Sequence, residues 1–263
     1  MDAPCDVAVR DAVATVTLNR PDVHNAFDEA LIARLTAAFV SIDDDPDVRV
    51  VVVAGAGRSF CSGADLNWMK RMAAFDREQN LDDANALAAM LRALYALSKP
   101  TIARVHGAAY GGGVGLVAAC DIAVGAPEAV FALSEAKLGL IPATIGPYVI
   151  EAIGARQARR RFLTAERFDA SEAVRIGLLH EVVALAELDA RIAALVAMLQ
   201  AAGPRAQLEC KALIRGVAHR PIDDDVIAGT AEHIAAVRAS PEGREGVAAF
   251  LGKRTPDWTQ RGS

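Results

Sequence analysis

Apolar and polar residues alternate at the start of the chain and then change to a helical spacing. Residues 7–10 and 14–18 alternate like the two strands of a hairpin joined by a short turn. Residues 28–44 carry apolar side chains at intervals of three and four, which predicts an amphipathic helix. Pro46 follows this helix, and the β-branched run at residues 48–54 predicts a strand buried on both faces, as in a parallel sheet.

The order of strand, small-residue turn and helix then recurs. A helix is expected at residues 65–75, a longer one ends near Leu97, and a strand follows at residues 101–105. A second turn opens an apolar helix at residues 113–120, and the next strand lies at residues 121–124. Strands that alternate with helices in this way predict parallel strands joined by right-handed crossovers.

The pattern changes beyond about residue 186, where no strand signal remains. Four successive helices are expected there, at residues 186–201, 204–217, 222–239 and 241–252. We therefore expect an α/β protein with two parts, a core at residues 1–185 and a C-terminal helical module at residues 186–263.

Composition and charge narrow the class of protein. Hydrophobic residues make up 53% of the 263 residues, which suits a well-filled core, yet the longest apolar runs are too short to span a bilayer. The N-terminus is acidic and lacks a signal-peptide pattern, so we expect a cytoplasmic protein that is not bound to a membrane. A net charge of −5 argues against nucleic acid as a partner. The basic cluster at residues 156–161 is interpreted as a solvated helix face or an intersubunit ion-pair site.

Two stretches of small residues carry the candidate chemistry. SFCSGADL at residues 59–66 and HGAAYGGGVGLVAACD at residues 106–121 each follow an apolar run and lead into a helix. Such turns leave backbone N–H groups pointing outward beside the positive end of a helix dipole. N–H groups from two turns can converge on one oxygen and form an oxyanion hole, which an enzyme needs to stabilise a thioester enolate. The sequence therefore predicts an enzyme.

Three further motifs accompany these stretches: RPDVHNAFD at residues 20–28, FALSEAKLGLIP at residues 131–142 and FLGKRTPDW at residues 250–258. In their order and spacing the five motifs resemble the crotonase (enoyl-CoA hydratase/isomerase) superfamily over nearly the whole chain. The resemblance implies a crotonase-like α/β fold, a spiral of ββα units with a C-terminal helical module. It also implies a homo-oligomer (a trimer, or a hexamer built as a dimer of trimers) and an acyl-CoA substrate. No separate cofactor is implied, because coenzyme A is part of that substrate.

Matched residue by residue, the resemblance implies that the backbone N–H groups of Ala64 and Gly112 form the oxyanion hole. It also implies a set of residues that bind the substrate and its coenzyme A: Asn25, Ala26, Ser62, Asp65, Leu66, Gly111, Phe250 and Lys253. Trp68 and Met69 follow the first turn and are expected either to wall the acyl pocket or to pack in the core. For Lys253, a plain exposed lysine is an equal alternative.

One carboxylate is the candidate acid and base. Many hydratases of the superfamily carry two glutamates; Glu135 matches one of them, and the position of the other falls on Gly115 within the substrate site. Glu135 lies in an apolar or neutral stretch, so we expect desolvation to raise its pKa into a useful range for proton transfer. Gly115 leaves a space that could hold water or be closed by Tyr110 or Ile145.

A single glutamate is compatible with three hypotheses. Hydration is possible if one carboxylate takes a proton from water and delivers it to the α-carbon, double-bond isomerisation needs one base, and a catalytically silent acyl-CoA-binding scaffold needs none. Residues 138–179 resemble the bacterial methylglutaconyl-CoA hydratase group, which favours hydration of 3-methylglutaconyl-CoA or a related branched enoyl-CoA. A carboxylate on that substrate would need a cation. Lys70, Arg71 and Lys137 are candidates by position, or else plain surface charges.

Three other residues have structural interpretations. Arg104 interrupts an apolar strand and is expected to pair with Asp65 or Asp121, because a charge removed from water needs a partner. His106 precedes the second turn and is expected to be hydrogen-bonded at a strand end, since no histidine spacing suggests a metal site. Cys61 has no accompanying His or Asn constellation, so it is not expected to act as a nucleophile.

Overall fold

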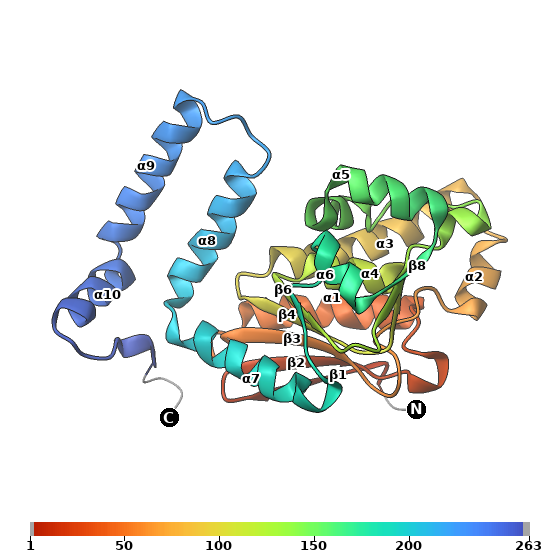
Figure 1. Ribbon diagram of the computed structural model, residues 1–263, viewed down its shortest axis with the longest axis horizontal. Coiled ribbons are helices and arrows are strands. Elements are labelled where there is room, and N and C mark those ends of the chain that lie inside the picture. Colours follow the sequence, from red (N-terminus) through yellow and green to blue (C-terminus); the bar gives the residue numbers. More distant parts are fainter. Residues whose placement is uncertain (1–2, 260–263) are drawn as a thin grey trace.

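The computed structural model describes residues 3–259 and consists of a core built on two β-sheets and a group of helices that projects from it (Figure 1). The main sheet contains, in spatial order, β1 (Cys5–Arg10), β2 (Val13–Leu18), β3 (Val50–Gly55), β4 (Thr101–Val105), β6 (Ile122–Gly125) and β9 (Glu181–Val182). The second sheet contains, in spatial order, β5 (Ala108–Tyr110), β7 (Val130–Ala132) and β8 (Arg167–Asp169).

Seven helices pack around the sheets of the described chain, and three C-terminal helices project from them. The core helices are α1 (Glu29–Asp44), α2 (Leu66–Met72), α3 (Arg77–Ala96), α4 (Gly112–Ala119), α5 (Gly146–Thr164), α6 (Ala170–Ile176) and α7 (Leu185–Ala201). The projecting helices are α8 (Pro204–Val217), α9 (Asp224–Ala239) and α10 (Pro241–Leu251). The expected boundary at residue 186 therefore falls at the start of α7, which lies on the core, and the projecting part begins with α8.

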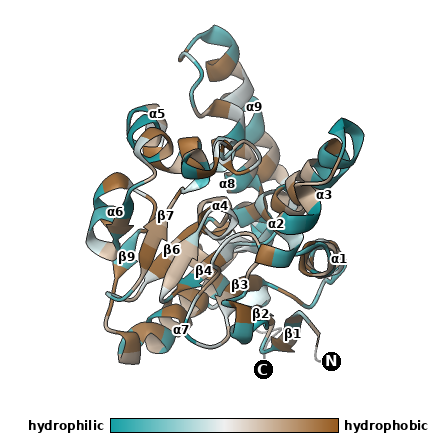
Figure 2. Cartoon of the chain, turned by 90° about the vertical axis from the view of Figure 1, so that its right-hand side faces the viewer, coloured by the Kyte–Doolittle hydropathy of each residue, from teal (hydrophilic) through white to brown (hydrophobic). Residues whose placement is uncertain are grey.

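The main sheet is parallel except at its first strand. β1 pairs antiparallel with β2, with Val7 opposite Val16, and β2, β3, β4, β6 and β9 continue in parallel, with Val52 opposite Ile102. Helices α1, α3 and α4 cover one face, and α7 covers the other, where Leu188 packs against the buried valines of β3 (Figure 2). Burial on both faces explains the continuous β-branched run in β3.

The periodic elements expected from the sequence are present. The hairpin, the helix after it and all four C-terminal helices are confirmed, the latter with bounds within two residues of those expected. The strand expected at residues 48–54 begins at Val50, because the preceding residues form a turn in which Val48 N donates to Asp45 O. The second sheet was not expected, since strands of three residues are too short to show an alternating pattern.

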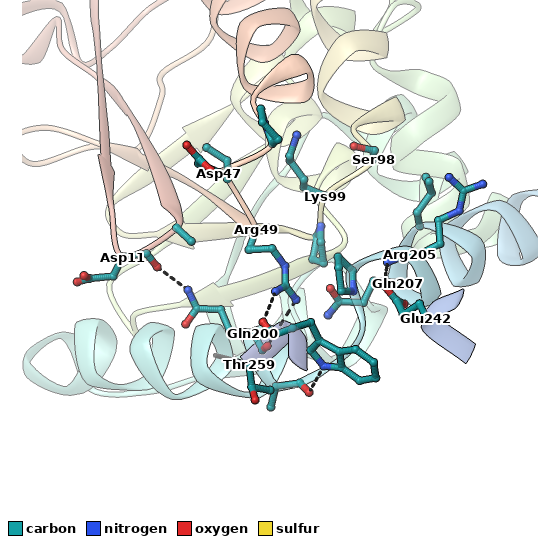
Figure 3. Close-up of a pocket in the computed structure, with 18 of the residues that line it drawn as sticks. Asp11, Asp47, Arg49, Ser98, Lys99, Gln200, Arg205, Gln207, Glu242 and Thr259 are labelled. Carbon is teal, nitrogen blue, oxygen red and sulfur yellow. Dashed lines mark hydrogen bonds between the residues drawn. The ribbon is translucent and has the colours of Figure 1, made fainter. Parts of the chain in front are cut away.

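Two groups of polar contacts attach the projecting helices to the core. Lys211 of α8 is buried, and its Nζ donates to Asp121 Oδ2 at 2.6 Å. Arg49, just before β3, donates to the carbonyl oxygens of Ala202 at 2.8 Å and Trp258 at 3.3 Å. A cavity of about 940 Å³ lies beside Arg49, at the amino ends of β3 and β4 (Figure 3).

Arg104 pairs with a different carboxylate from the two that were expected. Its Nε donates to Asp189 Oδ1 on α7. The expectation of Asp65 or Asp121 is wrong because Asp65 caps α2 and Asp121 accepts from α8, whereas α7 places Asp189 beside β4. His106 is hydrogen-bonded at the strand end, as expected, through Nε2 to a backbone carbonyl.

The basic cluster of α5 forms ion pairs within the chain. Arg160 pairs with Glu166 at 2.6 Å, and Arg161 is buried between Glu166 and Glu172. These pairs form inside one chain, whereas the ion-pair interpretation placed them between subunits. Among residues 3–259, none of the helices combines the length and the apolar character that a membrane span requires.

Replacing Lys211 with Met keeps an aliphatic stem but removes the ammonium group from Asp121. We expect the free energy of unfolding to fall by about 1–3 kcal/mol, less than for a fully buried pair, because the Asp121 side chain is 32% exposed. Urea unfolding at pH 7 measures this loss. Arg205→Met is the control, since Arg205 and Glu209 form an exposed pair worth at most about 1 kcal/mol. Equal losses in the two variants would contradict the anchoring role of Lys211.

Candidate active site

The two small-residue turns lie against each other. Cys61 N donates to Ala108 O at 3.0 Å, and Tyr110 N donates to Cys61 O at 2.9 Å, so the first turn pairs with β5. A Cβ on Gly113 would lie 2.3 Å from Cys61 O, closer than any side chain tolerates. This contact therefore depends on glycine, and it brings the N-terminus of α4 to the first turn.

Two backbone N–H groups at this contact have no hydrogen-bond partner among the described residues. Gly112 is the first residue of α4, so its N–H has no acceptor inside the helix. Phe27 N donates to Gly63 O at 2.7 Å and Asp65 N donates to Phe27 O at 2.8 Å. In such a parallel bridge, the N–H of the intervening Ala64 points away from Phe27. The structure thus brings together the turns that carry the two expected oxyanion donors.

Glu135 lies beside the second turn. It begins a short 3₁₀-helix, Glu135–Leu138, directly after β7. Gly111 N donates to Ala132 O at 2.9 Å, which holds the turn against the end of β7. Gly111 has φ +48°, and a Cβ on it would lie 3.2 Å from Glu135 Oε1. The carboxylate therefore lies beside Gly111, the residue that precedes Gly112.

The carboxylate of Glu135 is poorly solvated. Its Oε2 is buried, and no hydrogen-bond partner for it is found in the part of the chain that the structure describes. Burial raises the pKa of Glu135 above its ordinary value, and a hydrogen bond from its own backbone N–H offsets this only in part. The expected direction of the pKa shift is confirmed. A carboxylate whose pKa is raised is a stronger base than an ordinary glutamate, and its acid form persists to a higher pH.

The position matched to a second carboxylate is filled by Ile145. A Cβ on Gly115 would lie 2.4 Å from Ile145 Cγ2 and 3.6 Å from Leu91 Cδ2. Ile145 is buried at the start of α5. Water, Tyr110 and Ile145 are the three expected occupants of this space, and the structure shows Ile145 there. An apolar side chain thus occupies the space that a second carboxylate side chain would need.

Side chains after the first turn are held in different ways. Trp68 is buried, and its Nε1 donates to Asp83 Oδ1 at 2.9 Å, which fixes the edge of the indole. The buried Asp65 accepts from N–H groups in the first turn of α2 and caps that helix. Met69 is half-buried and Leu66 is exposed. Trp68 is thus fixed by α3, while Leu66 faces solvent.

The loop before α1 is fixed by a buried amide. Asn25 is completely buried, its Oδ1 accepts from Arg20 N at 2.8 Å, and its Nδ2 donates to two carbonyl oxygens of the loop after β3, both at 2.8 Å. Ala26 is buried beside it, and Ser62 is half-buried. The Asn25 side chain is thus occupied inside the protein and holds together the two loops beside the first turn.

Phe250 and Lys253 lie far from the two turns of their own chain. α10, which carries Phe250, is at the opposite end of the molecule from α2 (Figure 1). Phe250 is 82% exposed, and Lys253 is exposed just after the helix. Neither residue can contact the candidate site within one chain.

Other titratable groups near the site differ in their partners. Arg71 forms an exposed ion pair with Glu29. Lys70 is exposed on α2, and Lys137 is exposed on the 3₁₀-helix after β7.

Burial raises the pKa of Cys61 to about 12, so its thiol stays protonated at neutral pH, consistent with the expectation that it is not a nucleophile.

Sequence reasoning missed Arg20. Its Nη2 donates to Asp65 Oδ2 at 2.9 Å and lies 2.8 Å from Asp28 Oδ2. Asp28 precedes a helical pattern and could be recognised as a helix cap. Asp65 lies 45 positions from Arg20, so no local pattern indicates that the two residues meet.

Comparisons with known proteins agree with this geometry. The family model for enoyl-CoA hydratase/isomerase matches residues 8–261. The crystal structure of an enoyl-CoA hydratase from Shewanella pealeana is 41% identical, with a TM-score of 0.95 over 97% of this chain and 96% of that chain. Enoyl-CoA hydratase ACTT6 of Alternaria alternata is 34% identical, over 97% of this chain and 84% of that protein. Carnitinyl-CoA dehydratase of Salmonella enteritidis is 32% identical, over 95% of each. The resemblance and the fold indicated by the five motifs are confirmed.

The contact between Gly115 and Ile145 predicts a coupled pair of substitutions. Gly115→Ala should lower the free energy of unfolding by about 1–3 kcal/mol, because its methyl group overlaps Ile145. Ile145→Ala should cost about 2–4 kcal/mol by leaving a cavity. The double variant should lose less than the sum, because the new methyl group occupies part of that cavity.

Urea unfolding of the four proteins measures the coupling. Gly229→Ala in α9 is the control, since no atom lies within 4 Å of its added Cβ, and this change should be neutral or stabilising. Additive losses at Gly115 and Ile145 would contradict the packing described.

Proposed function

Because the chain belongs to the enoyl-CoA hydratase/isomerase family and is an enzyme of the crotonase superfamily, we propose that it reversibly hydrates an α,β-unsaturated acyl-CoA thioester. The observation that carries the proposal is the desolvated carboxylate of Glu135 against Gly111, beside the turns that present the free N–H groups of Ala64 and Gly112. Coenzyme A enters as part of the substrate, and the reaction requires no further cofactor.

In this mechanism the thioester carbonyl oxygen accepts hydrogen bonds from the N–H groups of Ala64 and Gly112. Glu135 takes a proton from water as the water oxygen adds to the β-carbon, and the electron pair of the double bond moves to the thioester oxygen. The resulting enolate is stabilised by the two N–H groups and by the N-terminus of α4. Glu135 then delivers its proton to the α-carbon, which restores the thioester and the ionised carboxylate.

For the substrate we propose 3-methylglutaconyl-CoA or a related branched enoyl-CoA. The support is the resemblance of residues 138–179 and the availability of cations for a distal carboxylate. Arg71 is already paired with Glu29, so Lys70 and Lys137 are the better candidates of the three considered.

The second candidate function is double-bond isomerisation, and Ile145 is the observation that favours it. Transfer of a proton from the α-carbon to the γ-carbon needs one base and no water. Because Ile145 fills the space at Gly115, Glu135 is left as the single carboxylate of the two matched positions, which suits that reaction as well.

The projecting helices support a proposal about assembly. They carry apolar side chains that are exposed in the single chain: Leu213, Ile214, Ile227, Ile234, Val247, Phe250 and Leu251. We propose that these helices mediate a homo-oligomer, a trimer or a dimer of trimers. Phe250 and Lys253 would then reach the coenzyme A site of a neighbouring copy, since they are remote from their own.

Two rate assays test the function. One follows the loss of enoyl-thioester absorbance with 3-methylglutaconyl-CoA beside crotonyl-CoA, and the other follows conjugation of a 3-enoyl-CoA. We expect selective turnover of methylglutaconyl-CoA. Conjugation of the 3-enoyl-CoA without hydration would establish isomerase activity. No turnover in either assay would favour a catalytically silent acyl-CoA-binding scaffold.

Replacing Glu135 with Gln should lower kcat by about 10²–10⁴-fold while thioester binding is retained, because the amide cannot transfer the proton. The wild-type rate should fall on acidification at a pH above the ordinary range of a glutamate, since burial raises the pKa of Glu135. Glu128→Gln, an exposed neighbour in the sequence, is the matched control. Undiminished turnover in the Glu135 variant would rule out this mechanism.

Sedimentation equilibrium tests the assembly. We expect wild-type protein at a multiple of three times the 27.6 kDa chain, and a shift to smaller species for Ile214→Glu and Phe250→Glu, because a charge opposes apolar contact. Val40→Glu introduces the same change at an exposed apolar position of α1 and should leave the mass unchanged. A wild-type monomer would contradict the proposal.

A further inference from the structure

An ion cluster beside the first turn takes no part in the mechanism above. The guanidinium of Arg20 donates to Asp65 at 2.9 Å, lies 2.8 Å from Asp28 and also donates to Ala26 O. Asp65 is 5% exposed, and the side chains of Arg20 and Asp28 are each 20% exposed. Burial raises the pKa of Asp65, but hydrogen bonds from Asn67 N–H and Arg20 outweigh it and lower the pKa overall. Asp65 therefore stays ionised at neutral pH.

Both carboxylates of the cluster cap helices that border the site. Asp28 accepts from a backbone N–H of α1 at 2.8 Å, and Asp65 accepts from two N–H groups of α2. The single guanidinium of Arg20 thus joins two helix starts. Phe27 precedes Asp28 and Ala64 precedes Asp65, so each residue of the bridged pair Phe27–Ala64 adjoins a carboxylate of the ion cluster.

Phe27 connects this cluster to both expected oxyanion donors. Its backbone N–H and carbonyl bond to the residues on either side of Ala64. Its buried ring lies against the second turn, where a Cβ on Gly112 would be 2.7 Å from Phe27 Cε2. Ala26 and Asp28, the two neighbours of Phe27, are both held by Arg20. A displacement of Arg20 would therefore move Phe27 relative to both turns.

We propose that Arg20 is a positioning residue of this enzyme, whose guanidinium sets the separation of the Ala64 and Gly112 N–H groups through Phe27. The inference rests on the proposed function, because it assigns those N–H groups to the thioester oxygen. A planar guanidinium serves three acceptors in a fixed arrangement, whereas the shorter ammonium of lysine cannot reproduce that arrangement. Misplacement of a reacting group by about 1 Å can cost about 10²-fold in rate.

Arg20→Lys tests this role because it keeps the positive charge but removes the planar guanidinium that serves three acceptors. We expect kcat to fall about 10–100-fold, with KM changed by less than about threefold. Asp28→Asn keeps a good helix cap but removes one charge, so it should give a smaller loss in the same direction. Arg191→Lys is the matched control, because Arg191 and Glu181 form a half-buried ion pair away from the site.

A second measurement reports on the oxyanion hole without turnover. Acetoacetyl-CoA ionises to an enolate that absorbs in the near ultraviolet, and bound enolate should be depleted in Arg20→Lys but not in Arg191→Lys. Affinity for coenzyme A alone should be the same in all variants, whereas a general loss of structure would weaken it.

The outcomes separate the inference from the function on which it rests. Wild-type kcat and enolate absorbance in folded Arg20→Lys would overturn the positioning role. If that variant does not fold, an unchanged kcat in Asp28→Asn overturns it instead. A wild-type protein that neither hydrates nor isomerises enoyl-CoA and forms no enolate would overturn the proposed function, and the role of Arg20 with it.

Discussion

Direct backbone contact between the two turns is the constraint on which the candidate site depends. A Cβ on Gly113 would lie 2.3 Å from Cys61 O and would force the turns apart, while a Cβ on Gly63 would lie 3.1 Å from Tyr110 O and leaves little room there. The groups that the site presents are therefore peptide N–H groups, which have no rotamer freedom to lose when a ligand binds. The chemistry of these donors is independent of the side chains at their own positions, provided that those side chains are small.

Burial shapes the candidate site at two positions. It raises the pKa of the Glu135 carboxyl by excluding water, and the buried Ile145 fills the space at Gly115. A carboxylate with an unpartnered buried oxygen is unfavourable for the folded state, and surrounding apolar contacts must offset that cost. Proteins commonly accept such a loss of stability where a group has to act on a substrate.

The sequence is informative where a feature depends on neighbouring residues. The hairpin, the parallel strands and the spacing of the C-terminal helices follow from local periodicity, and the two turns and Glu135 lie within continuous motifs. Features that join distant segments could not be predicted. Arg104 meets Asp189 because of where α7 packs, Arg20 meets Asp65 across a loop, and the three-residue strands of the second sheet pair only when tertiary packing places them side by side.

The projecting helices are attached to the core at both ends. Lys211 holds α8 to Asp121, and Arg49 holds the carbonyl of Trp258 near the end of the described chain. A segment attached to the core at two points has far less orientational freedom than one attached at a single point. Its exposed surface is consequently pre-organised, so that a partner docking on it loses little conformational entropy beyond that of association itself.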